Sequence, residues 1–422
     1  MDNVIDLLEE RGMIEQVTDE RLRELVERPL KVYCGFDPTA NSLHLGNMIS
    51  IMGLAWFQRC GHTPVALVGG ATGMVGDPAG KKHERQLLDA ATIEKNLVGI
   101  SKDLRAVLNS DDPAPVILNN YDWFEKIDLI TFLRDIGKHF RIGPMLAKDS
   151  VKARFESEEG MSFTEFSYQL LQGYDFLHLY DHQGVTLQLG GSDQWGNIVG
   201  GIDLIRKVRG ESSYGATFPL LTTSSGQKFG KSEKGAIWLS PEKVSPYDFY
   251  QYLFRVSDEE VIKMMRFLTF MPMEEIREWE SNMQSSQYAA NSAQKKLAEE
   301  VTRLVHGEEG VQRAQKATQA AAPGTDAVLN AETLEAAAQD LPVSTLKITE
   351  ILDQKFVDIF VKIGLNNSKG EVRRLVRNGG AYVNNTKITD ENETFKKQHL
   401  IDGKFLLLAA GKKNKRLVKI IE

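Results

Sequence analysis

Short apolar segments alternate with helical stretches over residues 1–222, and this alternation constrains the fold more than any other feature. The strand candidates are rich in β-branched, aromatic and glycine residues and lie at 30–36, 63–70, 116–118 and 186–191. Strands that alternate with helices are typical of βαβ units, which build a parallel sheet covered by helices. We therefore expect an α/β fold with a Rossmann-like parallel-sheet domain that binds ligands beyond the carboxyl ends of its strands. Before the first strand, helical spacing over 4–28 predicts one helix ending at Pro29.

The rest of the chain divides by composition. Strand signals stop near Tyr247, and a segment rich in helix formers follows until Pro323-Gly324. We expect a catalytic domain over 1–222, a mobile loop and connection over 223–246, an α-helical domain over 247–322, a linker over 323–344 and a small α+β domain over 345–422.

Charge is distributed unevenly along the chain. Residues 345–422 contain 16 Lys and Arg against 9 Asp and Glu, a net charge of +7, whereas the whole chain has a net charge of −7. A basic C-terminal module on an acidic body suggests that the module binds a polyanion. A lysine-rich end that is merely solvated is the alternative.

Composition and cysteine content exclude several classes of protein. With 42% hydrophobic and 26% charged residues, the chain is neither disordered throughout nor a coiled coil. Its two cysteines, Cys34 and Cys60, rule out a disulfide framework and a cysteine-rich zinc site. The N-terminus has no signal-peptide pattern, and no run approaches the roughly 20 apolar residues that span a bilayer. We expect a cytoplasmic protein without a membrane segment.

A polar turn with a histidine and a glycine leads from the first strand into a helix. The turn runs from Asp37 through Thr39 to His44, Gly46 and Asn47. Free N–H groups at a helix N-terminus favour an anion. By itself, a His-x-Gly-Asn run is more often an ordinary surface or core feature.

A second polar segment, Lys228-Phe229-Gly230-Lys231-Ser232, carries two lysines around a glycine. Such a segment suits a loop that closes over a polyphosphate, because lysine is a point charge on a flexible stem. Taken alone, it would more often be a solvated basic turn.

In this order and spacing, the two segments resemble the HIGH and KMSKS signatures of the class I aminoacyl-tRNA synthetases. Asn47 stands where the signature has its second histidine, and Phe229-Gly230 replaces Met-Ser. Asn47 keeps a side-chain donor, so we expect its contact with phosphate or ribose to survive with altered strength.

Three polar residues, Tyr168, Gln172 and Asp175, share one face of a predicted helix at spacings i, i+4 and i+7. Buried polar groups require partners, so this face suits a pocket wall better than a core. Without the two signatures, a core or surface position would be the better interpretation.

The whole set resembles the bacterial-type tyrosyl-tRNA synthetases over essentially the full chain. The resemblance implies that Tyr33 and Asp175 hold a tyrosine phenol, and that Tyr168, Gln172 and Asp77 bind the α-ammonium, with Gln194 near the carboxylate. It also implies an ATP site, formed by Gly35, Asp37, Thr39, His44, Gly46, Asn47, Gly191, Asp193 and Lys231. Ser232 keeps the hydroxyl of the second signature.

A Gly/Pro-rich segment over 76–85 resembles the mobile basic loop of this family, with Lys81 and Arg85 reaching pyrophosphate. A plain surface loop is about as plausible from sequence. The residues implied to act in catalysis are Thr39, His44, Asn47, Lys81, Arg85, Lys228, Lys231 and Ser232.

The C-terminal module carries its own pattern of cations. Lys369, Arg373 and Arg377 lie about one helical turn apart, and a glycine turn and a short strand follow. This resembles the RNA-binding domain named after ribosomal small-subunit protein four. The expected RNA-binding residues are Lys369, Arg373, Arg374, Arg377, Lys412, Lys413 and Lys415.

The reaction implied by the resemblance has two steps. The tyrosine carboxylate attacks the α-phosphorus of ATP, which releases pyrophosphate, and a tRNA 3′-terminal ribose hydroxyl then attacks the activated carbonyl. ATP would be a co-substrate bound with Mg²⁺, without a dedicated metal site or a tightly bound prosthetic group. The implied partners are tyrosine, ATP, tRNA(Tyr) and a second copy of the chain in a homodimer. Two alternatives are a tryptophanyl-tRNA synthetase-like enzyme and a catalytically idle RNA-binding paralogue.

Overall fold

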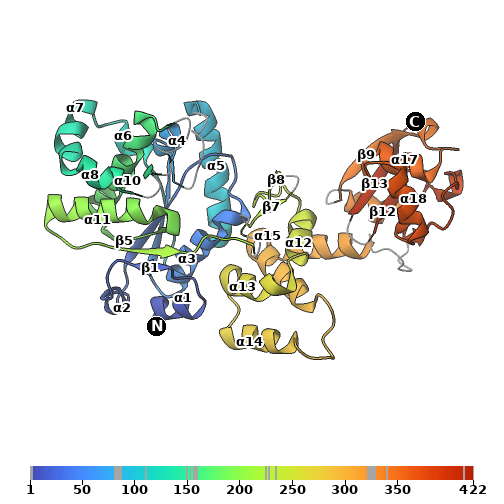
Figure 1. The fold of residues 1–422 in the computed structure, drawn as a ribbon, viewed down its shortest axis with the longest axis horizontal. Helices are drawn as coiled ribbons and strands as arrows, with labels where there is room; N and C mark the ends of the chain where they lie inside the picture. Colours follow the sequence, from blue (N-terminus) through green and yellow to red (C-terminus); the bar gives the residue numbers. More distant parts are fainter. Residues whose placement is uncertain are drawn as a thin grey trace. The chain divides into compact units, whose positions relative to one another are not determined.

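The computed structural model describes residues 3–79, 88–109, 112–148, 151–152, 154, 160–223, 226, 229–232, 235–320, 329–338, 341–411 and 414–421. The chain forms two compact units (Figure 1). Unit 1 comprises Met1–Ser240 and Val256–Val305, and unit 2 comprises Pro241–Arg255 and His306–Glu422.

Unit 1 is built on a sheet whose strands follow the order β1-β6-β5-β2-β3-β4. The strands are β1 (Gln16–Val17), β2 (Lys31–Phe36), β3 (Thr63–Val68), β4 (Val116–Asn119), β5 (Val185–Gly191) and β6 (Tyr214–Phe218). Neighbours from β6 to β4 are parallel, whereas the short β1 is antiparallel to β6. The predicted α/β fold with a parallel sheet is therefore confirmed. β6 and β1 are the strands that the sequence pattern did not predict.

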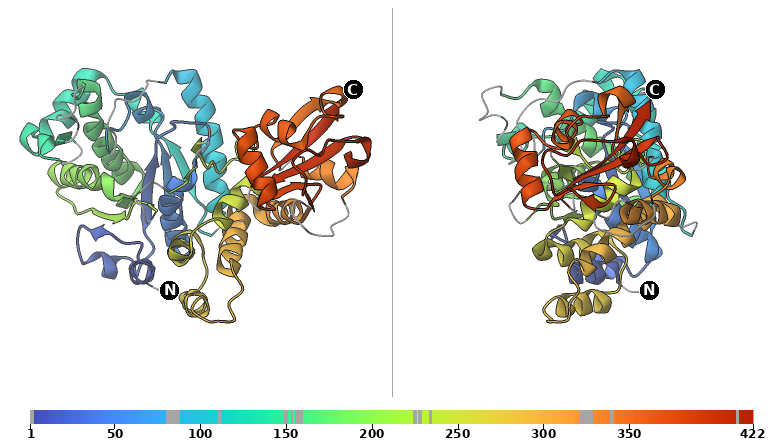
Figure 2. Two further views of the ribbon diagram at one scale, coloured as in Figure 1. Left: turned by 45° about the vertical axis from the view of Figure 1, so that its right-hand side comes forward. Right: turned by 90° about the vertical axis from the view of Figure 1, so that its right-hand side faces the viewer.

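The helices of unit 1 connect the strands, flank the sheet or pack against the flanking helices (Figure 2). They are α1 (Val4–Glu10), α2 (Leu22–Leu25), α3 (Met48–Arg59), α4 (Thr72–Val75), α5 (Ala90–Val107), α6 (Tyr121–Phe124), α7 (Leu129–Thr131), α8 (Ile142–Leu146), α10 (Phe163–Gln183), α11 (Trp195–Arg209), α13 (Asp258–Leu268) and α14 (Met273–Asn282). For example, α13 packs against α3. Short turns of other helix types are η1 (Leu45–Asn47), η2 (Phe132–Ile136), η3 (Gly137–His139) and η4 (Ser192–Gln194). A two-stranded ribbon, β7 (Lys231–Ser232) and β8 (Gly235–Ala236), follows the sheet. One apolar core joins strand residues such as Tyr33 and Val65 to Phe176 of α10 and Leu204 of α11.

The N-terminal segment differs from the prediction of one helix over 4–28. Gly12 has a φ of +73°, a left-handed conformation that ends α1 and that glycine adopts readily. Gln16 and Val17 then pair with Thr217 and Ala216 of β6. The segment 4–28, whose apolar spacing is helical, is thus divided into α1, β1 and α2 because β1 pairs with the sheet.

Unit 2 contains a second sheet with the strand order β11-β10-β12-β13-β9. Its strands are β9 (Val343–Lys347), β10 (Ala381–Val383), β11 (Thr386–Lys387), β12 (Phe405–Ala410) and β13 (Asn414–Ile421). Its helical elements are α12 (Pro246–Phe254), α16 (Ala331–Ala337), η5 (Ile348–Glu350), α17 (Phe356–Lys362), α18 (Lys369–Arg377) and η6 (Lys397–His399). Phe405, Leu407 and Leu417 of this sheet share a core with Tyr247 and Ala317. A small C-terminal α+β fold is confirmed.

The long helix α15 (Ser292–Ala320) belongs to both units. Gly307 interrupts its helical conformation with φ 69° and ψ −178°, next to the division between Val305 and His306. Within the segment predicted as a linker, the structure has α16 and the start of β9. The domain boundaries themselves stay a prediction. Across the described residues, no helix is long and apolar enough to cross a membrane.

Candidate active site

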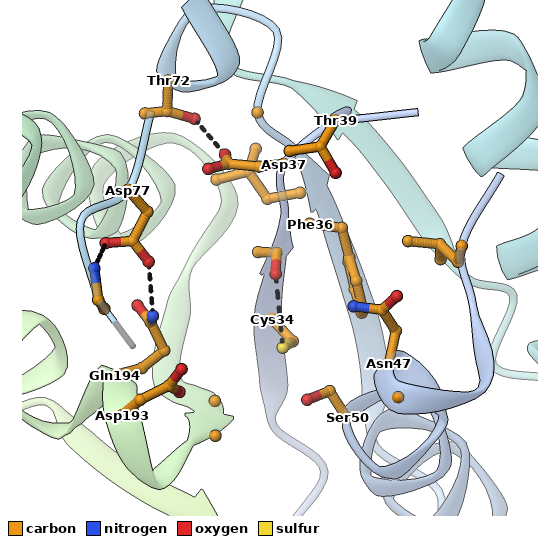
Figure 3. Close-up of a pocket in the computed structure, with 18 of the residues that line it drawn as sticks. Cys34, Phe36, Asp37, Thr39, Asn47, Ser50, Thr72, Asp77, Asp193 and Gln194 are labelled. Atoms are coloured by element: carbon orange, nitrogen blue, oxygen red, sulfur yellow. Dashed lines mark hydrogen bonds between the residues drawn. The ribbon is translucent and has the colours of Figure 1, made fainter. Parts of the chain in front are cut away.

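A cavity of about 690 Å³ lies at the carboxyl ends of β2, β3 and β5, beside α10 (Figure 3). Parallel strands bring their carboxyl ends to one edge, so residues far apart in sequence meet there. Apart from Lys231, whose side chain is not described, the described residues predicted for amino-acid and nucleotide binding line this one cavity: Tyr33, Gly35, Asp37, Thr39, His44, Gly46, Asn47, Asp77, Tyr168, Gln172, Asp175, Gly191, Asp193 and Gln194.

Tyr33 lies in the middle of β2 and is buried. Its ring contacts the ring of Phe176 with centroids 5.2 Å apart. Burial and the nearby Asp175 raise the pKa of the Tyr33 phenol well above its usual value, so the hydroxyl keeps its proton. Among the described residues this hydroxyl has no hydrogen-bond partner. It is therefore available to a ligand that offers a polar group.

Asp175 lies on α10, and two side chains hold its carboxyl group. Trp123 Nε1 donates to Oδ1 at 2.9 Å, and Asn120 Nδ2 donates to Oδ2 at 3.0 Å. Burial raises the pKa of Asp175 to about 8 although both hydrogen bonds act in the opposite direction. The site thus orients a buried carboxyl group beside the hydroxyl of Tyr33.

A chain of hydrogen bonds links Asp175 to Asp37 at the end of β2. Asn120 Nδ2 also donates to Thr72 Oγ1 at 3.0 Å, and the Thr72 hydroxyl donates to Asp37 Oδ1 at 2.9 Å. The Tyr168 hydroxyl donates to Asp37 Oδ2 at 3.0 Å. This chain connects the part of the pocket predicted for the phenol with the part predicted for the nucleotide.

A second polar group surrounds Asp77. Gln194 Nε2 donates to Asp77 Oδ2 at 2.7 Å, as drawn in Figure 3. Asn197 Nδ2 donates to Gln172 Oε1 at 3.0 Å. The structure thus brings together the residues predicted for the two polar ends of an amino acid.

The turn after β2 places His44 and Asn47 at the start of the next helix. The backbone N–H of His44 donates to Asn47 Oδ1 at 3.1 Å, so the nitrogen end of Asn47 carries the remaining donors. A Cβ on Gly46 would lie 2.9 Å from the His44 ring and 3.4 Å from the Phe229 carbonyl oxygen. The absence of a side chain at Gly46 therefore allows the His44 ring and the backbone of the second signature to lie close to this position.

The second signature is described only in part. Lys231 and Ser232 form β7, and Lys231 pairs with Ala236. Gly230 has a φ of +83°, and a Cβ there would lie 2.8 Å from the Gly46 nitrogen. The two signature segments are thus in contact. The side chains of Lys231 and Ser232, and all of Lys81, Arg85 and Lys228, lie outside the described residues.

Sequence reasoning missed the residues that hold the pocket's carboxylates. Asn120, Trp123 and Thr72 line or support the cavity, and none of them lies in a recognised motif. It also missed Lys148, whose ammonium is buried without a hydrogen-bond partner among the described residues. Burial lowers the pKa of Lys148 to about 8, against the effect of Asp77. Asn120 directly follows β4, and an asparagine at the end of an apolar strand was the one signal in the sequence that could have been followed.

The predicted RNA-binding cations of unit 2 have different surroundings. On α18, Val372 and Val376 are buried, and Arg373 and Arg374 are exposed. Lys369 pairs with Asp358 at 2.8 Å, and Arg377 pairs with Glu391 at 3.0 Å. Burial, with Arg255 nearby, lowers the pKa of Lys415 to about 8. Lys412 and Lys413 lie outside the described residues.

Metal-binding side chains do not gather in the described part of the chain. No group of three or more His, Cys, Asp or Glu residues that could hold a metal ion occurs among the residues described.

Two family models match the chain. Residues 25–322 match the model of the class I tRNA synthetases for tryptophan and tyrosine. Residues 333–418 match the model of the C-terminal domain of tyrosine–tRNA ligases.

Individual proteins are also similar to this chain, two of them over all or nearly all of its length. The tyrosine–tRNA ligase of Protochlamydia amoebophila is 61% identical and covers 100% of both chains. The chloroplastic/mitochondrial tyrosine–tRNA ligase of Arabidopsis thaliana is 53% identical over 99% of this chain and 84% of its own. A C-terminally truncated mitochondrial tyrosyl-tRNA synthetase of Coccidioides posadasii has a TM-score of 0.65 at 34% identity, covering 75% of this chain and 92% of its own.

Proposed function

The chain belongs to the class I synthetase family of tyrosine–tRNA ligases, and we propose that the cavity described above is where it activates tyrosine. The protein ligates L-tyrosine to its tRNA: tyrosyl-adenylate forms from tyrosine and ATP with release of pyrophosphate, and the tyrosyl group then passes to the 3′-terminal adenosine of tRNA. The observation that carries our assignment of the pocket is the buried Tyr33 hydroxyl beside Asp175, which has no hydrogen-bond partner in the part of the chain that the structure describes.

In this proposal the phenol of tyrosine fills the polar end of the pocket. A phenol can donate one hydrogen bond and accept another, which matches the carboxyl group of Asp175 and the hydroxyl of Tyr33. Phenylalanine would leave the buried Tyr33 hydroxyl without a partner, at a cost of about 1–3 kcal/mol, and would make no hydrogen bond to Asp175. Tyr168, Gln172 and Asp77 then bind the α-ammonium, and Gln194 lies near the carboxylate.

The chemistry of the first step requires little beyond positioning and charge. The tyrosine carboxylate is itself the nucleophile, so no general base is needed when it attacks the α-phosphorus in line. Donors and cations stabilise the charge that develops on the phosphate oxygens. We assign this role to Thr39, His44 and Asn47, together with Lys81, Arg85, Lys228, Lys231 and Ser232. Mg²⁺ bound to the ATP phosphates would neutralise part of their charge.

The test is ATP–pyrophosphate exchange with tyrosine, phenylalanine and tryptophan. We expect wild-type exchange with tyrosine and a loss of about tenfold or more in kcat/KM for tyrosine in Tyr33→Phe, because the variant loses one hydrogen bond to the phenol. Tyr174→Phe is the matched control, since it removes a hydroxyl from a half-buried tyrosine outside the cavity.

The possible outcomes separate the candidates. Preferential exchange with tryptophan would favour the tryptophanyl alternative, and no exchange with any amino acid would favour the idle paralogue. Equal kcat/KM in wild type and Tyr33→Phe would contradict the assignment of the phenol site.

We also propose a homodimer. Large apolar side chains are exposed between α7 and the start of α10: Leu129 is 68%, Ile130 is 70%, Ile142 is 61% and Phe163 is 80% exposed. The segment from α7 to α8 lies together at one end of unit 1 in Figures 1 and 2. Exposed apolar groups of this kind are typical of protein interfaces.

The basic α+β module is proposed to bind the tRNA, with exposed Arg373 and Arg374 among the cations that meet its phosphates. A cytoplasmic location is also part of this proposal; the similar ligase of Arabidopsis thaliana is named chloroplastic/mitochondrial.

A further inference from the structure

One face of α5 contacts the nucleotide-binding turn, Pro38–Leu43. Asn96, Gly99 and Asp103 lie at spacings i, i+3 and i+7, which places them on this face. α5 itself packs against α3, α4 and β3 of unit 1. The helix therefore connects the turn to the rigid part of the sheet.

Asp103 holds the last part of the turn. It is buried, and its Oδ2 accepts hydrogen bonds from the Ser42 hydroxyl and the Leu43 backbone N–H, each at 2.8 Å. Asn96 is also buried, and its Nδ2 donates to the Pro38 carbonyl oxygen at 2.8 Å. The two residues thus fix both ends of the turn.

Gly99 brings the middle of the turn against the helix. A Cβ at this position would lie 2.0 Å from the Asn41 carbonyl oxygen. Glycine inside a helix costs up to about 1 kcal/mol relative to alanine, so propensity disfavours it here. Glycine is needed here because the backbone of α5 approaches the backbone of Asn41 too closely to leave room for a side chain.

The other side of the turn contacts the segment that follows the lysine-bearing ribbon. Leu45 N donates to Ile237 O at 2.8 Å, and Leu239 N donates to Leu43 O at 2.9 Å. Ser240 N donates to Ser42 Oγ at 3.0 Å. The Ser42 hydroxyl therefore lies between Asp103 and Ser240, and the turn is held between α5 and residues 237–240.

We propose that Asn96, Gly99 and Asp103 are positioning residues for adenylate formation, which act by fixing the nucleotide-binding turn against α5 and against residues 237–240. The proposal rests on the function proposed above, because the turn contains Thr39 and leads directly into His44. A displacement of about 1 Å in such a site can lower a rate by about 100-fold. Tyrosine binds mainly to β2 and α10, so its affinity should depend little on this contact.

The experiment measures single-turnover adenylate formation at saturating tyrosine and ATP, the tyrosine Kd by equilibrium dialysis, and the midpoint of thermal unfolding. We expect Gly99→Ala and Asp103→Ala to lower the rate by at least about tenfold, with the tyrosine Kd changed by less than about twofold. Asp103→Asn should keep most of the wild-type rate, since asparagine retains an acceptor oxygen at this position. Val98→Ala is the control, because Val98 is 72% exposed on the same helix.

Ser42→Ala tests the contact between the turn and Asp103 by changing the turn and leaving α5 unchanged. It should also lower the rate, and the effect of the double variant should be smaller than the sum of the two single effects, because both substitutions remove the hydrogen bond between Ser42 and Asp103. Unchanged rates in these variants would overturn the proposal. A parallel loss of rate, tyrosine affinity and thermal stability would also overturn it, because the contact would then be structural only. A wild-type rate in His44→Ala would instead contradict the proposed site.

Discussion

At the scale of single residues, Asp175 shows burial and hydrogen bonding acting in opposite directions on one carboxyl group. Its two donors, Trp123 and Asn120, favour the carboxylate, whereas complete burial favours the protonated form. The result is a pKa of about 8, well above the usual value of an aspartate. The free protein therefore holds this carboxyl group largely protonated at neutral pH.

This pKa predicts how stability changes with pH. Because the folded-state pKa of Asp175 is raised, the folded protein binds more protons than the unfolded chain between about pH 4 and pH 8. The contribution of Asp175 is therefore fully present below pH 4 and is lost as pH rises through 8. Urea unfolding at pH 5, 6.5, 8 and 9 should show the free energy of wild type falling relative to that of Asp175→Asn.

The comparison with Asp175→Asn isolates this group, since every other titrating residue is shared. A difference between the two proteins that stays constant from pH 5 to pH 9 would show that Asp175 titrates in its ordinary range. These samples should contain no tyrosine, because a bound phenol changes the surroundings of the Asp175 carboxyl group.

At the scale of elements, α10 supports the pocket through a buried ion pair in its first turn. Ser162 caps the helix by accepting from Glu165 N at 3.2 Å, and Glu165 Oε2 accepts from Arg154 Nη2 at 2.8 Å. The two charged side chains are 1% and 3% exposed. Tyr168 follows Glu165 by three residues, so the pair fixes the turn that carries it.

Removing one partner of this pair should be strongly destabilising. We expect Arg154→Met to lower the free energy of unfolding by about 3–5 kcal/mol, because it leaves the Glu165 carboxylate buried without its partner. The double variant Arg154→Met, Glu165→Leu should lose much less. Urea denaturation of Arg154→Met, Glu165→Leu and the double variant measures the coupling energy between the two side chains.

Arg209→Met is the matched control for this cycle. Arg209, at the end of α11, pairs with Asp181 of α10 at 2.7 Å, but both side chains are accessible to solvent. Exposed pairs of this kind contribute about 0–1 kcal/mol. Equal losses in Arg154→Met and Arg209→Met would show that the buried pair has no special role.

At the scale of the whole molecule, the charge difference along the chain predicts a salt dependence for tRNA binding. Residues 345–422 have a net charge of +7 within a chain of net −7. Arg373→Glu with Arg374→Glu should weaken tRNA binding and reduce the slope of log K against log salt by roughly 0.7–0.9 for each phosphate that the arginines no longer neutralise. Exchange of ATP and pyrophosphate should be unchanged, because the residues assigned to it all precede residue 233.

The control reverses a charge elsewhere. Arg28→Glu alters an exposed arginine of unit 1, and we expect the wild-type salt slope. If both variants had the wild-type slope, α18 would not contact the tRNA. Substitutions are preferable to deletion of residues 345–422. Phe405 and Leu407 share a core with Tyr247, and deletion would expose that core to solvent.

The proposed homodimer makes a second prediction at this scale. Phe163 is 80% exposed at the start of α10, and Phe163→Asp would place a charge inside an apolar interface. Sedimentation velocity at micromolar concentration should show twice the monomer mass for wild type and a shift toward the monomer for the variant. Val98→Asp, at a residue 72% exposed on α5, should stay dimeric. A monomeric wild type would contradict the proposal.

The sequence by itself determined the parallel sheet, the two signature segments and the residues of one polar helix face. Each of these rests on local information: strand and helix periodicity, glycine at strand ends, and the spacing of Tyr168, Gln172 and Asp175 along one helix. The resemblance then assigned the family, which the similarity to known tyrosine–tRNA ligases confirms. The roles of individual pocket residues stay predictions.

Only the tertiary structure decided which residues hold that site in place. The partners of Asp175 are 52 and 55 residues away from it in sequence, and the serine held by Asp103 is 61 residues away. Gly12 and the pairing of Gln16 and Val17 with β6 likewise divided a segment with helical spacing. Periodicity reports which face of an element is buried, whereas a hydrogen bond or a close backbone approach depends on what the fold places opposite that face. That information exists only once the sheet has brought distant segments together.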